Sequence, residues 1–223
     1  RGQTLLSHLA FGADDVSYLA SPPGASALAA VAELELTDAS RIADIAAVRA
    51  RFGDRAAVLV ETTLLRRRAA DKLGPLGPQV SQWLFTDEAL QQATAAAVAL
   101  HRAARLARAG LPVHDATCSV GTELAALHRS GVRALGSDID PVRIAMARHN
   151  VGATTVLCRA DALHPVTRDT VVLVDPARRD GGRRRLRPED YRPALDRLID
   201  TYRGRHLVVK CGPGMDFDAL RRR

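Results

Sequence analysis

The sequence predicts an α/β fold in which an all-helical N-terminal region precedes a parallel, doubly wound sheet. Up to about residue 110, apolar residues recur at the spacing of amphipathic helices. After Pro112, short β-rich runs alternate with helical stretches, which is the order that right-handed crossovers between parallel strands require. The run at 171–174 is apolar throughout, as expected for a strand that is covered on both faces.

Three helices are expected before residue 110. The first follows a candidate cap at Thr37 and ends at Gly53, and the second follows Asp54 and ends at Gly74. The third begins after Thr86, with an apolar ridge toward the core and an arginine stripe on its other side. The ridge comprises Leu90, Ala93, Ala97, Leu100 and Ala104, and the stripe comprises Arg102, Arg105 and Arg108. This stripe is either a solvated face or an RNA contact.

Five strands are expected after residue 112. They are placed at 113–115, 134–137, 154–158, 170–174 and 206–210. The chain is accordingly divided into a helical region, a connecting helix and a sheet domain. Their bounds are 1–84, 85–110 and 111–223.

The composition excludes several classes of protein. Of 223 residues, 47% are hydrophobic and 26% charged, as in ordinary globular domains. No apolar stretch is long enough to span a bilayer, and the first residues lack the apolar segment of a secretory signal. Three cysteines outside any C-x-x-C pair favour a reducing compartment and indicate no zinc site. We therefore expect a cytoplasmic protein that contacts no membrane and holds no metal.

The basic residues are almost all arginines. The net charge is +7, and Lys72 and Lys210 are the only lysines among 32 basic residues. Arginine suits phosphate forks and stacking on bases, so nucleic acid is a natural partner. GC-rich codons would explain the same excess, together with the abundant alanine. Composition alone leaves both explanations open.

Carboxylates follow four of the five expected strands, where ligands of open α/β sheets bind. They are Asp115, Asp138, Asp161 and Asp175. The first loop has a single glycine, Gly121, and lacks the glycine-rich patterns that admit a pyrophosphate. At the end of the second strand, Asp138 suits ribose hydroxyls, while Asp161 suits an adenine amine. Together these residues predict an adenosine pocket without a diphosphate.

Some of these carboxylates also have a purely structural interpretation. Asp115 can cap the turn that follows it, and Asp161 can cap a short helix. Asp140, next to Asp138, is expected to cap the helix opened by Pro141 and is not assigned to the site. Both interpretations stay open for Asp115 and Asp161.

This order of motifs resembles the class I S-adenosylmethionine-dependent methyltransferases. Their first motif resembles VHDATCSVGT at 113–122, and their second resembles GSDIDP at 136–141. Their third and fourth resemble RADA at 159–162 and DPAR at 175–178. The resemblance covers residues 112–214 and implies a Rossmann-like sheet. Since such sheets normally have two further strands, it also implies a sheet truncated after its fifth strand.

A looser resemblance concerns bacterial RNA methyltransferases with a C-terminal THUMP-like domain. It rests on the helical front half, on WLFT at 83–86, on QAT at 92–94 and on DPARR at 175–179. The THUMP-like domain itself is not in this sequence. The resemblance implies an RNA acceptor, tRNA or rRNA, that is methylated on a base.

The resemblance to the class I enzymes implies S-adenosylmethionine as the cofactor and a set of contacts. The implied cofactor-binding residues are Asp115, Thr117, Gly121, Asp138, Ile139, Asp161 and Ala162. The implied catalytic residues are Asp175, Pro176 and Arg178. Amino-methylating relatives read Asp/Asn-Pro-Pro-aromatic at this motif, whereas Ala177 and Arg178 stand at its last two positions here. An arginine plane can also stack on a base.

The acceptor side allows several interpretations. The loop 178–187 holds six arginines and is expected to grip RNA phosphates beside the target pocket, unless it is simply a solvated loop. A second interpretation makes Cys211 the nucleophile of a C5-pyrimidine RNA methyltransferase, with Lys210 favouring its thiolate; otherwise Cys211 is a small packing residue. Rival functions are a non-catalytic cofactor- or RNA-binding module and a methyltransferase for small molecules or proteins. The sequence leaves the oligomeric state open.

Overall fold

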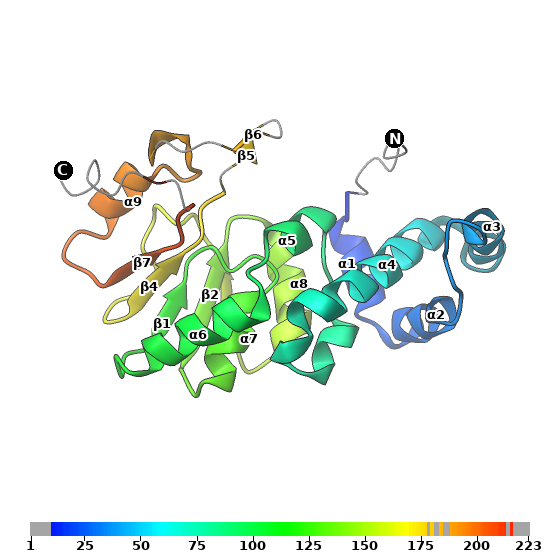
Figure 1. Cartoon of the computed structure of the whole chain (residues 1–223), viewed down its shortest axis with the longest axis horizontal. Helices are drawn as coiled ribbons and strands as arrows, with labels where there is room; N and C mark the ends of the chain where they lie inside the picture. Colours follow the sequence, from blue (N-terminus) through cyan, green and yellow to red (C-terminus); the bar gives the residue numbers. More distant parts are fainter. Residues whose placement is uncertain (1–9, 178, 181–182, 185–187, 213–214, 216–223) are drawn as a thin grey trace.

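A five-stranded parallel sheet forms the centre of the C-terminal half (Figure 1). The computed structural model describes residues 10–177, 179–180, 183–184, 188–212 and 215. Its strands are β1 (Val113–Asp115), β2 (Ala134–Asp138), β3 (Val156–Arg159), β4 (Val171–Val174) and β7 (Leu207–Val209). They lie in the order β3-β2-β1-β4-β7, so the order reverses between β1 and β4. The expected doubly wound α/β fold is confirmed.

The two faces of the sheet pack against different layers. In β4, Val171 and Leu173 belong to a core shared with the helices that precede and follow β1, whereas Val172 and Val174 belong to a second core. The helices on the first side are α6 (Ala96–Ala107) and α7 (Thr122–Arg129), which contact each other, and α8 (Pro141–Val151). Helix α9 (Leu195–Thr201) covers the other side. The uniformly apolar run of β4 therefore reflects burial on both faces.

The N-terminal region is helical, as expected. Its helices are α1 (Ala13–Leu19), α2 (Pro22–Ala32), α3 (Arg41–Phe52) and α4 (Ala56–Leu73), followed by the 3-10 turns η2 (Gly74–Leu76) and η3 (Pro78–Gln82). Helix α4 packs against α2 and α3, and α1 packs against α8. One buried cluster runs from Phe11 in this region to Leu173 in the sheet. The helices and one face of the sheet therefore share a core.

Two of the predicted caps differ in the structure. Helix α3 begins after Ser40, because the Thr37 carbonyl first accepts a hydrogen bond from the Arg41 amide and forms a preceding turn. Asp54 lies in the 3-10 turn η1 (Gly53–Arg55), and α4 begins after Arg55. The predicted helix ends at Gly53 and Gly74 are confirmed.

The third predicted helix is broken. Thr86 caps it as expected, accepting a hydrogen bond from the Ala89 amide, but α5 (Asp87–Gln92) ends two residues after Leu90. Ala93 and Ala95 take extended ψ angles of 138° and 140°, and α6 begins at Ala96. The buried ridge of α6 is Ala96, Ala99, Ala103 and Leu106, while the predicted Ala97 and Ala104 are exposed. The break rotates the helix face, so periodicity read across it was wrong.

Arginine side chains hold the N-terminal elements together. Arg67 donates to the carbonyls of Ala32, Leu34 and Glu35 at the end of α2, and Arg68 pairs with Asp87 at the start of α5. Arg66 donates to the carbonyls of Gln82 and Trp83, and its burial lowers the pKa of its guanidinium to about 10. Arg102, expected in a stripe that was either a solvated face or an RNA contact, pairs with Glu123 of α7. These four cations are therefore structural.

Asn150 joins three parts of the fold. From α8, its Oδ1 accepts a hydrogen bond from the Leu84 amide at 2.7 Å, and its Nδ2 donates to the carbonyls of Leu84 and Val120 at 2.9 Å each. The side chain is buried. It thereby ties the segment before α5 and the loop after β1 to the same helix.

The chain after β4 crosses to α9 through a short hairpin and a turn. The hairpin strands are β5 (Arg179–Asp180) and β6 (Arg183–Arg184), and the turn is η4 (Pro188–Asp190). Residues 178, 181–182 and 185–187 of the predicted arginine-rich loop lie outside the described residues. Across the described ranges, no helix has the length and apolar character needed to cross a membrane.

Candidate functional site

A cleft of about 690 Å³ opens beyond the carboxyl ends of β1, β2 and β4. Three parts of the chain line it: the loops that follow the strands, the α5–α6 break at 92–94, and the segment 189–197. Its volume is in the range of small-molecule and cofactor pockets. Its position, where the strand order reverses, is where open α/β sheets bind ligands.

Asp115 lies at the floor of this cleft, at the end of β1. Its Oδ1 accepts a hydrogen bond from the Thr117 amide at 3.2 Å, so it does cap the turn that follows. The carboxyl group is buried, and this burial, together with the nearby Glu123, raises its pKa well above the ordinary value. Asp175 and Asp138 add smaller contributions in the same direction. A cation in the cleft would favour the ionised form.

Asp138 connects the end of β2 to the loop after β1. Its Oδ2 accepts a hydrogen bond from the Ser119 amide at 2.9 Å, and its Oδ1 accepts one from the Asp140 amide at 3.0 Å. Ser119 has a positive φ of 49°, a conformation that turns its amide toward Asp138. Because a carboxylate oxygen has two lone pairs, each oxygen can accept one further O–H donor. Ile139, the next residue, is 61% exposed and lines the cleft.

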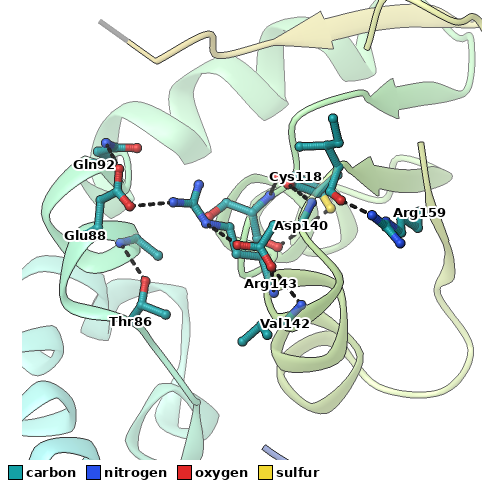
Figure 2. Close-up of polar contacts among 12 residues, drawn as sticks. Thr86, Glu88, Gln92, Cys118, Asp140, Val142, Arg143 and Arg159 are labelled. Carbon is teal, nitrogen blue, oxygen red and sulfur yellow. Dashed lines mark hydrogen bonds and ion pairs between the residues drawn. The ribbon is translucent and has the colours of Figure 1, made fainter. Parts of the chain in front are cut away.

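Helix α8 begins at the rim of the cleft and contacts α5 there. Asp140 caps α8 as predicted, accepting hydrogen bonds from the amides of Val142 and Arg143 (Figure 2). Arg143 reaches across to Glu88 of α5, with its Nη2 2.8 Å from Oε2 (Figure 2). Arg159 donates to the Ile139 carbonyl at 3.0 Å. These contacts fix the residues that flank Asp138.

Asp161 lies in a turn after β3. Its Oδ1 accepts a hydrogen bond from the Leu163 amide at 2.9 Å, so it caps this turn and not the short helix that the sequence allowed. Its carboxylate also lines the cleft, beside Ala162. Ala162 is buried, and its carbonyl accepts a hydrogen bond from the Tyr202 hydroxyl at 2.7 Å. Capping and a place in the cleft are compatible for both Asp115 and Asp161.

Asp175 lies at the end of β4. Its amide donates to the Thr117 hydroxyl at 2.7 Å, and its Oδ2 lies 2.5 Å from the Lys210 ammonium nitrogen. Pro176 follows and is buried, but it is not among the described residues that line the cleft. Arg178 lies outside the described residues. Of the three predicted catalytic residues, the structure places Asp175 in the cleft.

Gly121 stands behind the cleft rather than in its lining. It precedes α7 with a φ of 90°, and a Cβ there would lie 2.8 Å from Cγ1 of Val151. Only glycine fits both the conformation and this close approach. Its part in the site is therefore to let the loop after β1 turn tightly against α8.

Cys211 does not join the cleft lining in the described part of the chain. It packs against the core on the α9 side, and the Lys210 ammonium pairs with Asp175. The geometry thus favours the packing interpretation of Cys211. Cys118 is buried, and burial raises the pKa of its thiol well above the ordinary value.

Thr94, Glu123 and Tyr191 are among the lining residues that sequence reasoning did not assign to the site. Thr94 comes from the unexpected break before α6, Glu123 from the first turn of α7 and Tyr191 from the segment before α9. Tyr191 is buried, and its hydroxyl accepts a hydrogen bond from the Gly212 amide at 3.0 Å. Thr94 belongs to the QAT motif and Glu123 directly follows the first motif, whereas no quoted motif contains or adjoins Tyr191. Within the described ranges, no group of three His, Cys, Asp or Glu side chains is placed to hold a metal ion.

Comparison with solved structures identifies the fold. A crystal structure from Porphyromonas gingivalis W83, named as a methyltransferase, superposes with a TM-score of 0.64 over 96% of this chain and 53% of its own, at 18% identity. The chain has a methyltransferase fold. The match extends over nearly the whole chain and therefore includes the N-terminal helices.

Sequence comparison finds longer relatives. Two Mycobacterium tuberculosis proteins, from strains CDC 1551 and H37Rv, are each 69% identical over 180 residues, which is 78% of this chain. Both are named as uncharacterized S-adenosylmethionine-dependent methyltransferases. The chain spans about half the length of these curated relatives, since the match covers 50% of each. A family described as a domain of unknown function (DUF8688) matches residues 12–69, within the helical part of the methyltransferase fold.

Proposed function

We propose that this chain binds S-adenosylmethionine and transfers its methyl group to a base in tRNA or rRNA. The observation that carries the proposal is the meeting of Asp115, Asp138 and Asp175 in one cleft at the switch point of a methyltransferase fold. The names of two relatives at 69% identity support the cofactor and the reaction. In this proposal the helical region and the sheet domain act as one cytoplasmic unit.

The cleft residues fit this cofactor. S-adenosylmethionine supplies an electrophilic methyl group on a positively charged sulfonium. Asp115, Glu123, Asp138 and Asp175 all line the cleft, so its floor is acidic although the chain as a whole is basic. Asp138 would hold the ribose hydroxyls, and Asp161 with Ala162 would face the adenine. Thr117 and Ile139 would complete the contacts.

The acceptor side is built around Asp175. Lys210 contacts Oδ2, so Oδ1 is left to accept an N–H hydrogen bond from an exocyclic amine of the target. This bond would direct the nitrogen lone pair into the cleft, and the rate gain would come mainly from positioning. Pro176 would stiffen the motif, and Arg178 would stack on the base where amino-methylating relatives have an aromatic residue.

Exposed cations support an RNA acceptor. Arg192 and Arg197 are exposed and line the cleft, and the sequence at 178–187 holds six further arginines. The acidic floor and basic rim suit a ligand with a cationic reacting centre and an acceptor with a phosphate backbone. The resemblance to RNA methyltransferases with a THUMP-like domain supports the same acceptor.

Calorimetric titration of the full chain with S-adenosylhomocysteine tests the cofactor. We expect binding, with affinity at least about tenfold weaker in Asp138→Ala, because the ribose contacts and two backbone anchors are lost together. Asp140→Ala is the matched control, since it removes a neighbouring carboxylate that caps α8 but does not line the cleft. Absence of binding by the unaltered chain would contradict the proposal.

Transfer of a tritiated methyl group tests the acceptor. Unmodified tRNA and rRNA transcripts, a protein extract and a small-molecule extract are offered separately. Labelling of RNA that is abolished by Asp175→Ala, with cofactor affinity retained, is the expected result. Labelling of protein or of small molecules, without labelling of RNA, would contradict RNA as the substrate and indicate that class instead. Cofactor binding without any transfer would indicate a non-catalytic module.

A further inference from the structure

Lys210 bridges two residues that line the cleft and come from distant parts of the chain. Its ammonium donates to Oδ2 of Asp175 at 2.5 Å and to Oγ1 of Thr94 at 2.9 Å. Asp175 follows β4, whereas Thr94 belongs to the α5–α6 break, more than 80 residues earlier in the chain. One nitrogen atom therefore joins the N-terminal region to the acceptor side of the cleft.

The lysine acts from behind the cleft. Asp175 and Thr94 both line it, but Lys210 is not among the described lining residues. Thr94 is buried, and the side chains of Lys210 and Asp175 are only 19% and 26% exposed. Because the ammonium sits outside the space open to a ligand, it can orient the two lining side chains without occupying the position of a substrate.

The geometry of this bridge suits a lysine better than an arginine. An ammonium is a compact point donor with three N–H groups, so one atom can serve two acceptors that approach from different directions. An arginine presents a planar fork and would place its donors farther apart. The chain uses its other lysine in the same way: Lys72 donates to the carbonyls of Leu90 and Gln91 at 2.7 and 3.0 Å, at the end of α5. Lys72 thus holds the end of α5 through residues that do not line the cleft, whereas Lys210 holds Thr94, which does.

We propose that Lys210 is a positioning residue for methyl transfer, which fixes the Asp175 carboxylate against the Thr94 hydroxyl. This inference rests on the proposed function for its catalytic consequence. Lys210 occupies Oδ2 and thereby fixes the direction in which Oδ1 faces the target. Thr94, whose oxygen accepts from Lys210, directs its own O–H away from the ammonium. The N-terminal break and the acceptor carboxylate then form one rigid unit.

The kinetic test uses Lys210→Met, Lys210→Arg and Thr94→Val, with Lys72→Met as the matched control. Lys210→Met should lower kcat at least about tenfold, because displacing a positioning carboxylate by about an ångström lowers the reaction rate by that factor or more. Affinity for S-adenosylhomocysteine should stay within about twofold. Lys210→Arg should recover part of kcat, and Lys72→Met should retain it. Unchanged kcat in Lys210→Met would overturn the positioning role.

A second test needs no substrate. Hydrogen exchange of the amides at 92–96 should be at least about threefold faster in Lys210→Met and in Thr94→Val. In the double variant, exchange should be no faster than in the more affected single variant, because both substitutions remove the same hydrogen bond. Independent, additive effects would overturn the bridge. If the unaltered chain neither binds S-adenosylhomocysteine nor transfers methyl groups, the proposed function fails, whereas this exchange experiment still decides whether the bridge exists.

Discussion

At the scale of single residues, the ionised carboxylate of Asp115 lowers the stability of the fold but favours the binding of a cation. Its raised pKa means that the folded chain holds a proton at pH values where the unfolded chain has lost it. The free energy of unfolding therefore falls as the pH rises from the ordinary aspartate value of 3.8 toward the folded pKa. A positively charged ligand would offset this loss of stability by pairing with the ionised carboxylate.

Asp115→Asn should separate these two effects. The amide keeps an acceptor for the Thr117 amide but carries no charge, so we expect a higher free energy of unfolding at pH 7 than in the unaltered chain. Affinity for S-adenosylmethionine should fall by about tenfold, because a charge-assisted contact is lost. Denaturation across pH 4–8 and calorimetry measure both. A variant that is less stable at pH 7 would contradict the pKa direction.

His114 titrates in the opposite direction on the same strand. Burial, and to a lesser extent Arg205, lowers its pKa from 6.5 to about 4, and its ring nitrogens contact the hydroxyls of Thr167 and Ser137. The unfolded chain therefore binds a proton that the folded chain does not. We expect His114 to reduce stability as the pH falls from 6.5 to about 4, by up to about 1.4 kcal/mol per pH unit.

His114→Gln tests this contribution. Glutamine keeps a donor and an acceptor but does not titrate, so the acid-side slope of the free energy of unfolding should become shallower between pH 6.5 and 4. Urea denaturation at half-unit intervals of pH measures the slope. The same series on Asp115→Asn serves as the control, because that variant should instead change the slope in the opposite sense.

At the scale of elements, the strands were predictable and the α5–α6 break was not. Each strand carries its own signal, an apolar β-rich run that ends at a polar residue, as Asp115 and Asp138 illustrate. The break lies in a run of alanines around Thr94, where local propensity favours continued helix. A tertiary contact is made there, since Lys210, which follows β7 more than 100 residues later, reaches Thr94. The local hydrophobic periodicity cannot predict a contact between residues so far apart in the sequence.

The loop after β1 makes a prediction about Gly121. Gly121→Ala should lower the free energy of unfolding by about 2–4 kcal/mol, because it combines a left-handed φ with an approach of 2.8 Å to Val151. Gly131→Ala is the matched control: its φ of 72° is similar, but a Cβ there meets nothing within 4 Å. Gly131→Ala should lower the free energy of unfolding by only about 1–2 kcal/mol. Equal losses in urea denaturation would exclude the close contact as the cause.

At the scale of the whole molecule, the helical region and the sheet are joined by buried polar contacts as well as by a shared core. Asn150 binds Leu84 on one side and Val120 of the loop after β1 on the other. The sequence pointed to the carboxylates of the cleft but not to this connection, because a single asparagine in a helix has no distinguishing pattern. The boundaries at 84 and 110 remain a prediction.

Asn150→Asp tests the connection. The isosteric change removes both donors, so the buried carbonyls of Leu84 and Val120 lose their partner and face a carboxyl oxygen. We expect a loss of about 3 kcal/mol in the free energy of unfolding. His149→Ala is the neighbouring control, since His149 makes one exposed contact to Gln82 and should cost about 0.5 kcal/mol. A loss as small as that of the control would show that the hydrogen bonds of Asn150 contribute little to holding the two parts together.

The two lysines also give the chain a built-in chemical reporter. A reagent that acylates side-chain amines can react only at Lys72 and Lys210, since all other basic side chains that carry a fixed charge are arginines. Burial, with the neighbouring Lys210 and Arg68, lowers the pKa of Lys72 and so enlarges its neutral, nucleophilic fraction. The rate of labelling at these two positions would follow the opening of the α5–α6 break, without any engineered probe.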